Sequence, residues 1–303
     1  MSGTRRPSPI SGRTWRESFK RRSELAITLD DPTGVEDRDD DLDIPSPWLA
    51  KYGRFLGGAI GLTGFLVIWW LVVATGYVSD MYLATPQDTV KAFADGLLDG
   101  TLSSEIWPSV QRALIGFLIA LVAGISLGIV VGSFTIFQTL AEPVLVFFRN
   151  LSLLALLPVF VVFLGIGEES KIAIVVWACF WPIFVNAVGA VGGVERQLLN
   201  SARALGAGRW YTFVHVILPA AIPAIFPGIR LASANAFTAL VAAELVGGAQ
   251  GIGIYINNAA LRYQTPQMYA GILALGLIGV VVNAVMTGIE WRVTRWQRGL
   301  TNK

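Results

Sequence analysis

The chain has 303 residues, of which 54% are hydrophobic and only 15% are charged, with a net charge of +2. Soluble globular proteins carry about 25% charged residues, so this composition excludes an ordinary soluble domain and favours a membrane protein with bilayer-spanning apolar stretches. Cys179 and His215 are the only residues of their types, which excludes an intrachain disulfide and any centre built from several cysteines or histidines.

Residues 1–45 form a polar tail that is basic in its first half and acidic in its second half. No apolar stretch follows the early arginines, so the tail is not a cleaved signal peptide. Two interpretations stay open. The tail is either a solvated, disordered cytoplasmic arm or a segment that touches anionic lipid or a partner subunit. Residues 46–303 are predicted to form the transmembrane domain.

Six long apolar stretches follow the tail, each near the roughly 20 residues that cross about 30 Å of hydrocarbon. Backbone groups inside a bilayer must find partners within their own segment, so each stretch is predicted to be a helix. The expected fold class is an all-α membrane protein with six transmembrane helices. The predicted spans are Phe55–Val78, Ser109–Ser133, Glu142–Leu164, Lys171–Gly192, Ile222–Leu245 and Met268–Ile289.

Two patterns refine this outline. Pro86–Gly100, between the first two spans, has one apolar face and is predicted to be a short interfacial helix on the outer surface. In the second span, small residues recur at multiples of four positions, which predicts close packing against a neighbouring helix. These residues are Gly116, Gly124, Gly128 and Gly132.

Basic residues set the expected orientation. With the N-terminus inside, the inner side receives nine lysines and arginines beyond the tail, whereas the outer side receives four. Because cytoplasmic loops carry the excess of basic residues, both termini are predicted to be cytoplasmic.

The inner loop between the fourth and fifth spans is too apolar and too periodic for a flexible linker. Val194–Leu205 is predicted to be a helix that ends at Gly206 in the left-handed conformation. A second helical run begins at Arg209 and has an apolar face, and the prolines Pro219 and Pro223 are expected to punctuate the return into the membrane. A helix–glycine–helix unit of this kind suits a groove on a soluble partner.

The segment Ser201–Pro223, SARALGAGRWYTFVHVILPAAIP, resembles the characteristic cytoplasmic loop of the permeases of ATP-binding-cassette (ABC) importers. The family pattern is Glu-Ala-Ala, three residues, Gly, nine residues, Ile, any residue, Leu-Pro. Here Asn200 stands for the Glu and Ser201 for the first Ala. The resemblance implies that residues 193–219 couple the chain to an ATPase. The coupling positions are Asn200, Ser201, Ala202, Gly206, Leu218 and Pro219.

Four shorter motifs resemble one branch of that family, the nitrate, sulfonate, taurine and bicarbonate permeases. They are Leu83–Pro86, Phe163–Ile172, Gly228–Ala232 and Leu240–Gly248. The branch usually carries Arg-Pro-Ile-Pro-Pro early in the third span, whereas this chain reads RNLSL over Arg149–Leu153. The resemblance implies a small oxyanion such as a sulfonate or nitrate as cargo, and the altered stretch is compatible with a different substrate.

The resemblance also implies the type I importer permease (MetI-like) fold and the partners of the chain. The sequence has no G-x-x-x-x-G-K-[ST] phosphate loop, so ATP is expected to bind a separate ATPase, present in two copies. An extracytoplasmic solute-binding protein delivers the substrate, and a permease homodimer forms the pathway by alternating access. The chain is expected to contact membrane lipid, to bind no nucleic acid, metal or cofactor, and not to be an enzyme.

Polar residues deep in the spans are candidates for the substrate pathway, because their burial in lipid is costly. The alternative for each is a hydrogen bond between helices. The candidates in the third to fifth spans are Ser152, Trp181, Asn186, Asn235 and Thr238.

Three charged residues have two interpretations each. Arg149 and Arg230 either serve an anion pathway or reach the inner interface, with Glu142 as a possible ion-pair partner. Glu244 either belongs to the pathway at the outer gate or caps the helix that begins in the following glycine-rich segment.

Three other classes compete with the permease interpretation. A secondary transporter would usually show repeated halves and broken spans, and a membrane enzyme would need convergent histidines, cysteines or carboxylates. A non-ABC membrane scaffold would leave Asn200–Pro219 without a purpose.

Overall fold

The computed structural model describes residues 47–79 and 81–295, so the predicted tail of residues 1–45 lies outside the described residues. The chain divides into two compact units, residues 1–62 and 63–303. The described part of the first unit is the beginning of helix α2 (Pro47–Ala74). Everything below concerns the second unit.

Every regular element in the described part of the chain is helical, which confirms the predicted all-α class. Among the described residues, five helices are long and apolar enough to cross a membrane, or six spans if a bent pair of helices counts as one. In chain order after α2 the elements are α3 (Pro86–Leu98), α4 (Thr101–Ser133), α5 (Thr135–Arg149), α6 (Leu153–Leu164), α7 (Glu168–Gly192), α8 (Arg196–Ala204), α9 (Arg209–Thr212), the π-helical turn η1 (Phe213–Ile217), α10 (Leu218–Gly247), α11 (Ile252–Leu261) and α12 (Thr265–Val293).

The short helix predicted between the first two spans is α3. The hydroxyl oxygen of Thr85 caps it by accepting the N–H of Asp88 at 3.0 Å. At its other end the carboxylate of Asp99 accepts the N–H and the hydroxyl of Thr101. These two bonds stabilise the charged form and lower the pKa of the Asp99 carboxyl.

The prediction of a continuous third span over Glu142–Leu164 is wrong. The chain breaks between α5 and α6, where the axes of Glu142–Arg149 and Leu153–Leu164 differ by 92°. The amide of Asn150 donates to the carbonyl oxygen of Val146 at 2.6 Å, which closes the last turn of α5. Ser152 then takes an extended conformation and begins α6. Arg149, Asn150 and Ser152 interrupt the apolar run at the break, but polar residues also occur inside membrane helices, so they do not by themselves reveal the bend.

The glycines of α4 pack against α7, as their spacing predicts. A Cβ atom on Gly116 would lie 2.7 Å from the Cβ of Val175, and one on Gly128 would lie 2.5 Å from the Cβ of Ala187. Real Cβ atoms do not approach so closely, so the two backbones meet only because these positions lack side chains. At Gly124 and Gly132 the nearest atoms of α7 would lie 2.9 Å from an added Cβ.

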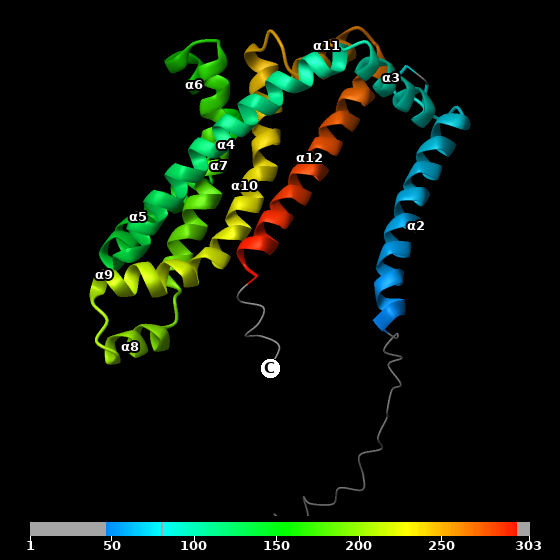
Figure 1. Ribbon diagram of the computed structural model, residues 1–303. Helices are drawn as coiled ribbons and strands as arrows, with labels where there is room; N and C mark the ends of the chain where they lie inside the picture. Colours follow the sequence, from blue (N-terminus) through cyan, green and yellow to red (C-terminus); the bar gives the residue numbers. More distant parts are fainter. Residues whose placement is uncertain (1–46, 80, 296–303) are drawn as a thin grey trace, which may run out of the picture. The chain divides into compact units, whose positions relative to one another are not determined.

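Helix α10 packs along another side of α7, and the three helices α4, α7 and α10 lie side by side (Figure 1). Their contact forms the main apolar core, which includes Val175, Ile183 and Leu240. The thiol of Cys179 lies within it and donates to the carbonyl oxygen of Ala232 at 3.3 Å. Helix α7 is therefore the central element against which the other two are positioned.

The loop between α7 and α10 folds as a helix, a left-handed glycine and a second helix. Gly206 has φ +77°, and its N–H donates to the carbonyl oxygen of Arg203 while that of Ala207 donates to Ala202. This pair of bonds is the Schellman arrangement that ends helices at glycine. The predicted left-handed glycine is confirmed.

The prolines after this loop, Pro219 and Pro223, do not break the helix, but its direction changes between α9 and the rest of α10 (Figure 1). Arg209–Val246 runs as one helical span. In the π-helical turn η1 the N–H of Leu218 donates to the carbonyl oxygen five residues earlier, on Phe213. Pro219, which has no backbone N–H, lies where the hydrogen bonding returns from the π to the α pattern. The helix therefore continues although this residue donates no hydrogen bond.

Candidate functional site

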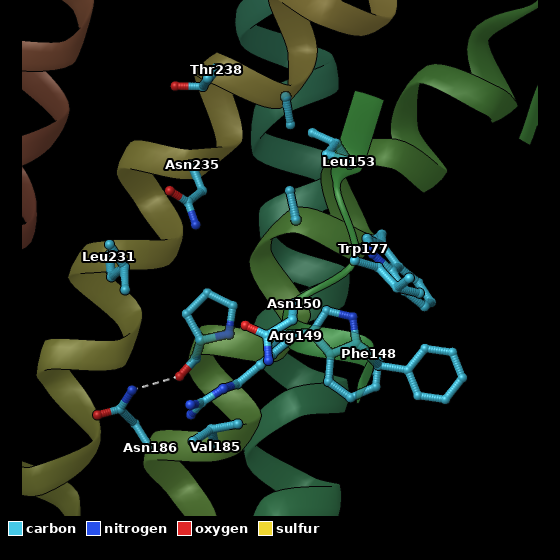
Figure 2. A pocket seen from close by; sticks show the side chains of 15 residues that line it. Phe148, Arg149, Asn150, Leu153, Trp177, Val185, Asn186, Leu231, Asn235 and Thr238 are labelled. Atoms are coloured by element: carbon cyan, nitrogen blue, oxygen red, sulfur yellow. Dashed lines mark hydrogen bonds between the residues drawn. The ribbon is translucent and has the colours of Figure 1, made fainter. Parts of the chain in front are cut away.

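A cavity of about 490 Å³ lies beside the break between α5 and α6, with α7 and α10 as its other walls (Figure 2). Helices α5 and α6 both contact α7, so the break lies against it. Polar and aromatic side chains from four helices line it. The lining residues are Phe148, Arg149, Asn150, Leu151, Leu153, Trp177, Ala178, Trp181, Pro182, Val185, Asn186, Leu231, Asn235, Thr238 and Ala239.

Four of the predicted pathway residues meet in this cavity. Trp181 and Asn186 come from α7, while Asn235 and Thr238 come from one face of α10. Ser152 lies in the break between two lining residues but does not itself line the cavity. The polar residues chosen from the sequence thus lie on two of the helices that form the walls, α7 and α10. The candidate position near the third wall, Ser152, is adjacent to residues that line the cavity.

The amides and the hydroxyl in the cavity do not tie helices together. Asn186 donates to the carbonyl oxygen of Pro182 at 2.8 Å, and Thr238 donates to that of Ala234, both within their own helices. Among the described residues, none forms a hydrogen bond with the side chain of Asn235, which Figure 2 shows beside the cavity. Its donors and acceptor are available to a molecule in the cavity.

Aromatic rings form the opposite wall. Phe148 stacks on Trp181 with ring centroids 5.3 Å apart, and Trp177 meets both rings edge-on. The indole N–H of Trp181 is buried and has no hydrogen-bond partner in the described part of the chain. Trp177 and Phe148 were not predicted. The spacing of Trp177 and Trp181, four residues apart on one helix face, is the signal that could have found the wall.

Arg149 is the cationic group of the cavity. It is the last residue of α5, and none of the ion pairs found among the described residues involves it, so the pairing with Glu142 is not observed. Arg230 behaves differently. Its guanidinium pairs with the carboxylate of Glu290 on α12, outside this cavity. Of the two arginines considered from the sequence, only Arg149 can meet an anion here.

Glu244 does not line the cavity. Its carboxylate is fully buried and accepts the hydroxyl of Ser109 at 2.6 Å, the guanidinium of Arg112 at 3.0 Å and the N–H of Gly253 at 2.8 Å. The last bond lies in the first turn of α11, as the capping alternative expects. Arg112 also pairs with Glu168 at the start of α7. The network therefore joins α4, α7, α10 and α11.

The positions that resemble a coupling motif lie on the loop after α7. Asn200 and Ser201 are exposed on α8, Ala202 is buried beneath them, and Gly206 is exposed at the turn. Leu218 and Pro219 are half-buried at the start of α10. Two large apolar side chains in this loop point into solvent, Leu205 at 88% and Trp210 at 77% exposure. Such exposed apolar groups are typical of a docking surface.

The loop and the buried network lie at opposite ends of the helices. Figure 1 shows α8 and α9 at one end, with α3 and α11 at the other. Arg112 and Glu168 are near the beginnings of α4 and α7, whereas α8 follows the end of α7. The sequence predicts that these two groups of residues face different compartments, and in the structure they lie at opposite ends of the helices.

Comparison with known proteins matches residues 120–296 to a family model described as "Binding-protein-dependent transport system inner membrane component". A "Probable ABC transporter permease protein" of Brucella abortus is 34% identical over 244 residues, covering 80% of this chain and 95% of the relative. The taurine transport system permease protein TauC of Escherichia coli is 30% identical over 255 residues, covering 82% and 93%.

Among solved structures, a chain of the MetNI methionine ABC transporter in inward-facing conformations superposes with a TM-score of 0.56. The match covers 64% of this chain and 96% of the other, at 19% sequence identity. At that identity the likeness shows the fold alone, and it is the fold that the resemblance implied.

Proposed function

Because the chain belongs to the family of binding-protein-dependent transport system inner-membrane components, we propose that its cavity is the translocation site for a small oxyanion. The observation that carries this is the convergence of Arg149 with the amides of Asn150, Asn186 and Asn235 in one cavity. A guanidinium and side-chain amides are the donors that match oxyanion oxygens. The family membership makes the chain a permease subunit that works with an ATPase and a substrate-binding protein.

Energy reaches this cavity through the loop of residues 193–219, which docks on the ATPase. The exposed Leu205 and Trp210 offer apolar anchors for a groove on that partner. Trp210 and Asn235 belong to one helical span, Arg209–Val246, so a displacement of the loop moves one wall of the cavity. ATP-driven closure of two ATPase copies thereby alternates access to the site.

The partners and orientation follow from the same assignment. A homodimer around a twofold axis supplies two such chains, because one chain provides walls on only part of a central path. Both termini are cytoplasmic, as the basic residues indicate, and the solute-binding protein docks at the end that carries α3 and α11. Taurine, the solute in the name of the Escherichia coli relative, carries an anionic sulfonate group that fits the charge of the cavity.

The test is ATP-driven uptake of taurine and of nitrate by proteoliposomes that contain the full chain with its co-purified ATPase and binding protein. Arg149→Gln should lower uptake at least tenfold, because hydrogen bonds to charged groups contribute about 1.5–3 kcal/mol. Arg230→Gln, which removes the same charge outside the cavity, should leave uptake within about twofold. Equal uptake by wild type and Arg149→Gln would overturn the assignment of the cavity.

A further inference from the structure

We infer that the cavity selects an organic anion with a planar unsaturated ring, such as an aryl sulfonate or aryl carboxylate, rather than an inorganic oxyanion. This inference rests on the proposed function and narrows the class of its substrate. The acidic group would bind at Arg149 and at the start of α6, and the ring would lie against Phe148, Trp177 and Trp181. Both ends of such a molecule find matching chemistry in the lining.

The anionic end of the cavity has two sources of positive potential. Arg149 carries the full charge and has no carboxylate partner among the described residues. Leu153 lines the cavity at the first position of α6, and the cap residue Ser152 makes no side-chain hydrogen bond to the helix. The first N–H groups of a helix have no acceptor within it, so these donors and the helix dipole add to the guanidinium.

The aromatic wall is held in place by its own contacts. The rings of Phe148 and Trp181 are 5° from parallel, and Trp177 lies at 74° and 72° to them. Phe160 meets Trp177 edge-on, and Phe180 meets Trp181 edge-on. A planar ligand ring gains from stacked or edge-on contact with such a surface. The unpartnered indole N–H of Trp181 offers a donor to an acceptor atom beside that ring.

Size and polarity disfavour an inorganic anion. Cavities of about 300–1,000 Å³ bind organic ligands in proteins, and this one measures about 490 Å³. Nitrate or bicarbonate has four or five atoms, so it would occupy the arginine end and leave the aromatic wall uncovered. It would also lose hydration on its side facing the wall without gaining a partner there. An attached ring replaces that loss with buried apolar contact.

The test is equilibrium binding to the purified, detergent-solubilised complex, with radiolabelled benzenesulfonate as the probe and methanesulfonate and nitrate as competitors. Benzenesulfonate should bind at least tenfold more tightly than methanesulfonate, since a stacked ring contributes about that factor. Nitrate should compete only at concentrations another tenfold or more higher. Comparable binding of all three anions, or no binding of benzenesulfonate, would overturn the inference.

Variants separate the two ends of the cavity. Trp177→Leu should weaken benzenesulfonate binding about tenfold and leave methanesulfonate binding unchanged, while Trp177→Phe, which keeps a ring, should restore most of the affinity. Trp107→Leu, at an exposed tryptophan outside the cavity, is the control and should change neither. Equal losses for both anions in Trp177→Phe would contradict the ring contact. Unchanged binding of both anions in Arg149→Gln would instead count against the proposed function.

Discussion

At the scale of single residues, Asn235 is the most informative position in the cavity. Its amide lies midway along a membrane span, where contact with lipid would be costly. Among the described residues, none forms a hydrogen bond with this amide. Asn186 and Thr238 bond only to their own helices. The sequence left two roles open for these residues, and the observed bonds favour the cavity over the helix interface.

Asn235→Leu keeps the approximate size of the side chain and removes its hydrogen-bonding groups. The variant should assemble and hydrolyse ATP normally, while uptake falls on the order of tenfold, because a lost buried hydrogen bond costs about 1–3 kcal/mol. Asn283→Leu, on α12 and outside this cavity, is the matched control. A drop in thermal stability of Asn235→Leu with normal uptake per folded complex would assign Asn235 to packing instead.

Glu244 carries a structural role at the residue scale. Glu244→Gln removes the charge that Arg112 meets inside the protein, and loss of one partner of a buried ion pair typically costs about 3–5 kcal/mol. The variant should therefore lower the melting temperature of the solubilised protein markedly. Glu169→Gln, an exposed neighbour of the network, should melt like wild type. Equal melting of both variants would show that the network contributes little stability.

Part of the site could be predicted because polar residues in apolar spans stand out. Asn186, Asn235, Thr238 and Trp181 were found in this way, and all four line the cavity. Phe148 could not be found, because an aromatic residue within an apolar helix looks the same from the sequence whether it faces lipid, the core or a cavity. Glu244 stood out equally, but its spacing from Arg112 and Ser109 along the chain gives no hint that they meet.

At the scale of elements, the helix lengths and the glycine contact of α4 were predictable, and the break in the third span was not. Glycine spacing reports packing directly, since only a missing side chain allows the approach seen at Gly128. The break depends on Asn150 closing a turn and Ser152 opening another. Both residues also occur inside helices, so their identity alone does not predict the 92° bend.

Gly128→Ala tests the contact between α4 and α7. The added Cβ would lie 2.5 Å from the Cβ of Ala187 and 3.0 Å from a backbone oxygen, and overpacking of this kind costs about 1–3 kcal/mol. Gly279→Ala meets no atom within 4 Å and gains helix propensity of about 0.5–1 kcal/mol. Thermal unfolding should therefore shift down for Gly128→Ala and stay level or rise for Gly279→Ala. The reverse order would contradict the close packing.

Gly206→Val tests the loop. A Cβ at Gly206 would meet no atom within 4 Å, so the cost lies entirely in the backbone, which holds φ at +77°. A β-branched residue strongly disfavours this conformation, and the Schellman turn should open. Uptake should fall while the protein remains in the membrane. Gly208→Ala, at a glycine with φ −67° and open space, should transport normally. Normal uptake by Gly206→Val would remove the loop from the coupling route.

At the scale of the whole molecule, the orientation in the membrane is the remaining prediction. A cysteine at Gly167 should react with an impermeant thiol reagent added outside, and a cysteine at Gly208 only after the reagent gains access to the inside. Both glycines have open space for a side chain, and the native Cys179 is buried, which keeps the background low. Labelling in the opposite sense would reverse the orientation derived from the basic residues.

The five-residue π-helical turn η1, between α9 and α10, determines how the side chains before it are rotated about the helix axis relative to those after it. In a helix of 3.6 residues per turn, one additional residue rotates everything beyond it by about 100° about the axis. Trp210 and Asn235 lie on either side of Phe213–Ile217 in one continuous helical stretch. The π-helical turn therefore fixes the rotational orientation of the cavity-facing side of α10 relative to the exposed indole of Trp210. If the turn tightened to the α pattern, the segment that carries Trp210 and the segment that carries Asn235 would rotate relative to each other about the helix axis. A displacement of the loop would then reach Asn235 as a rotation of α10.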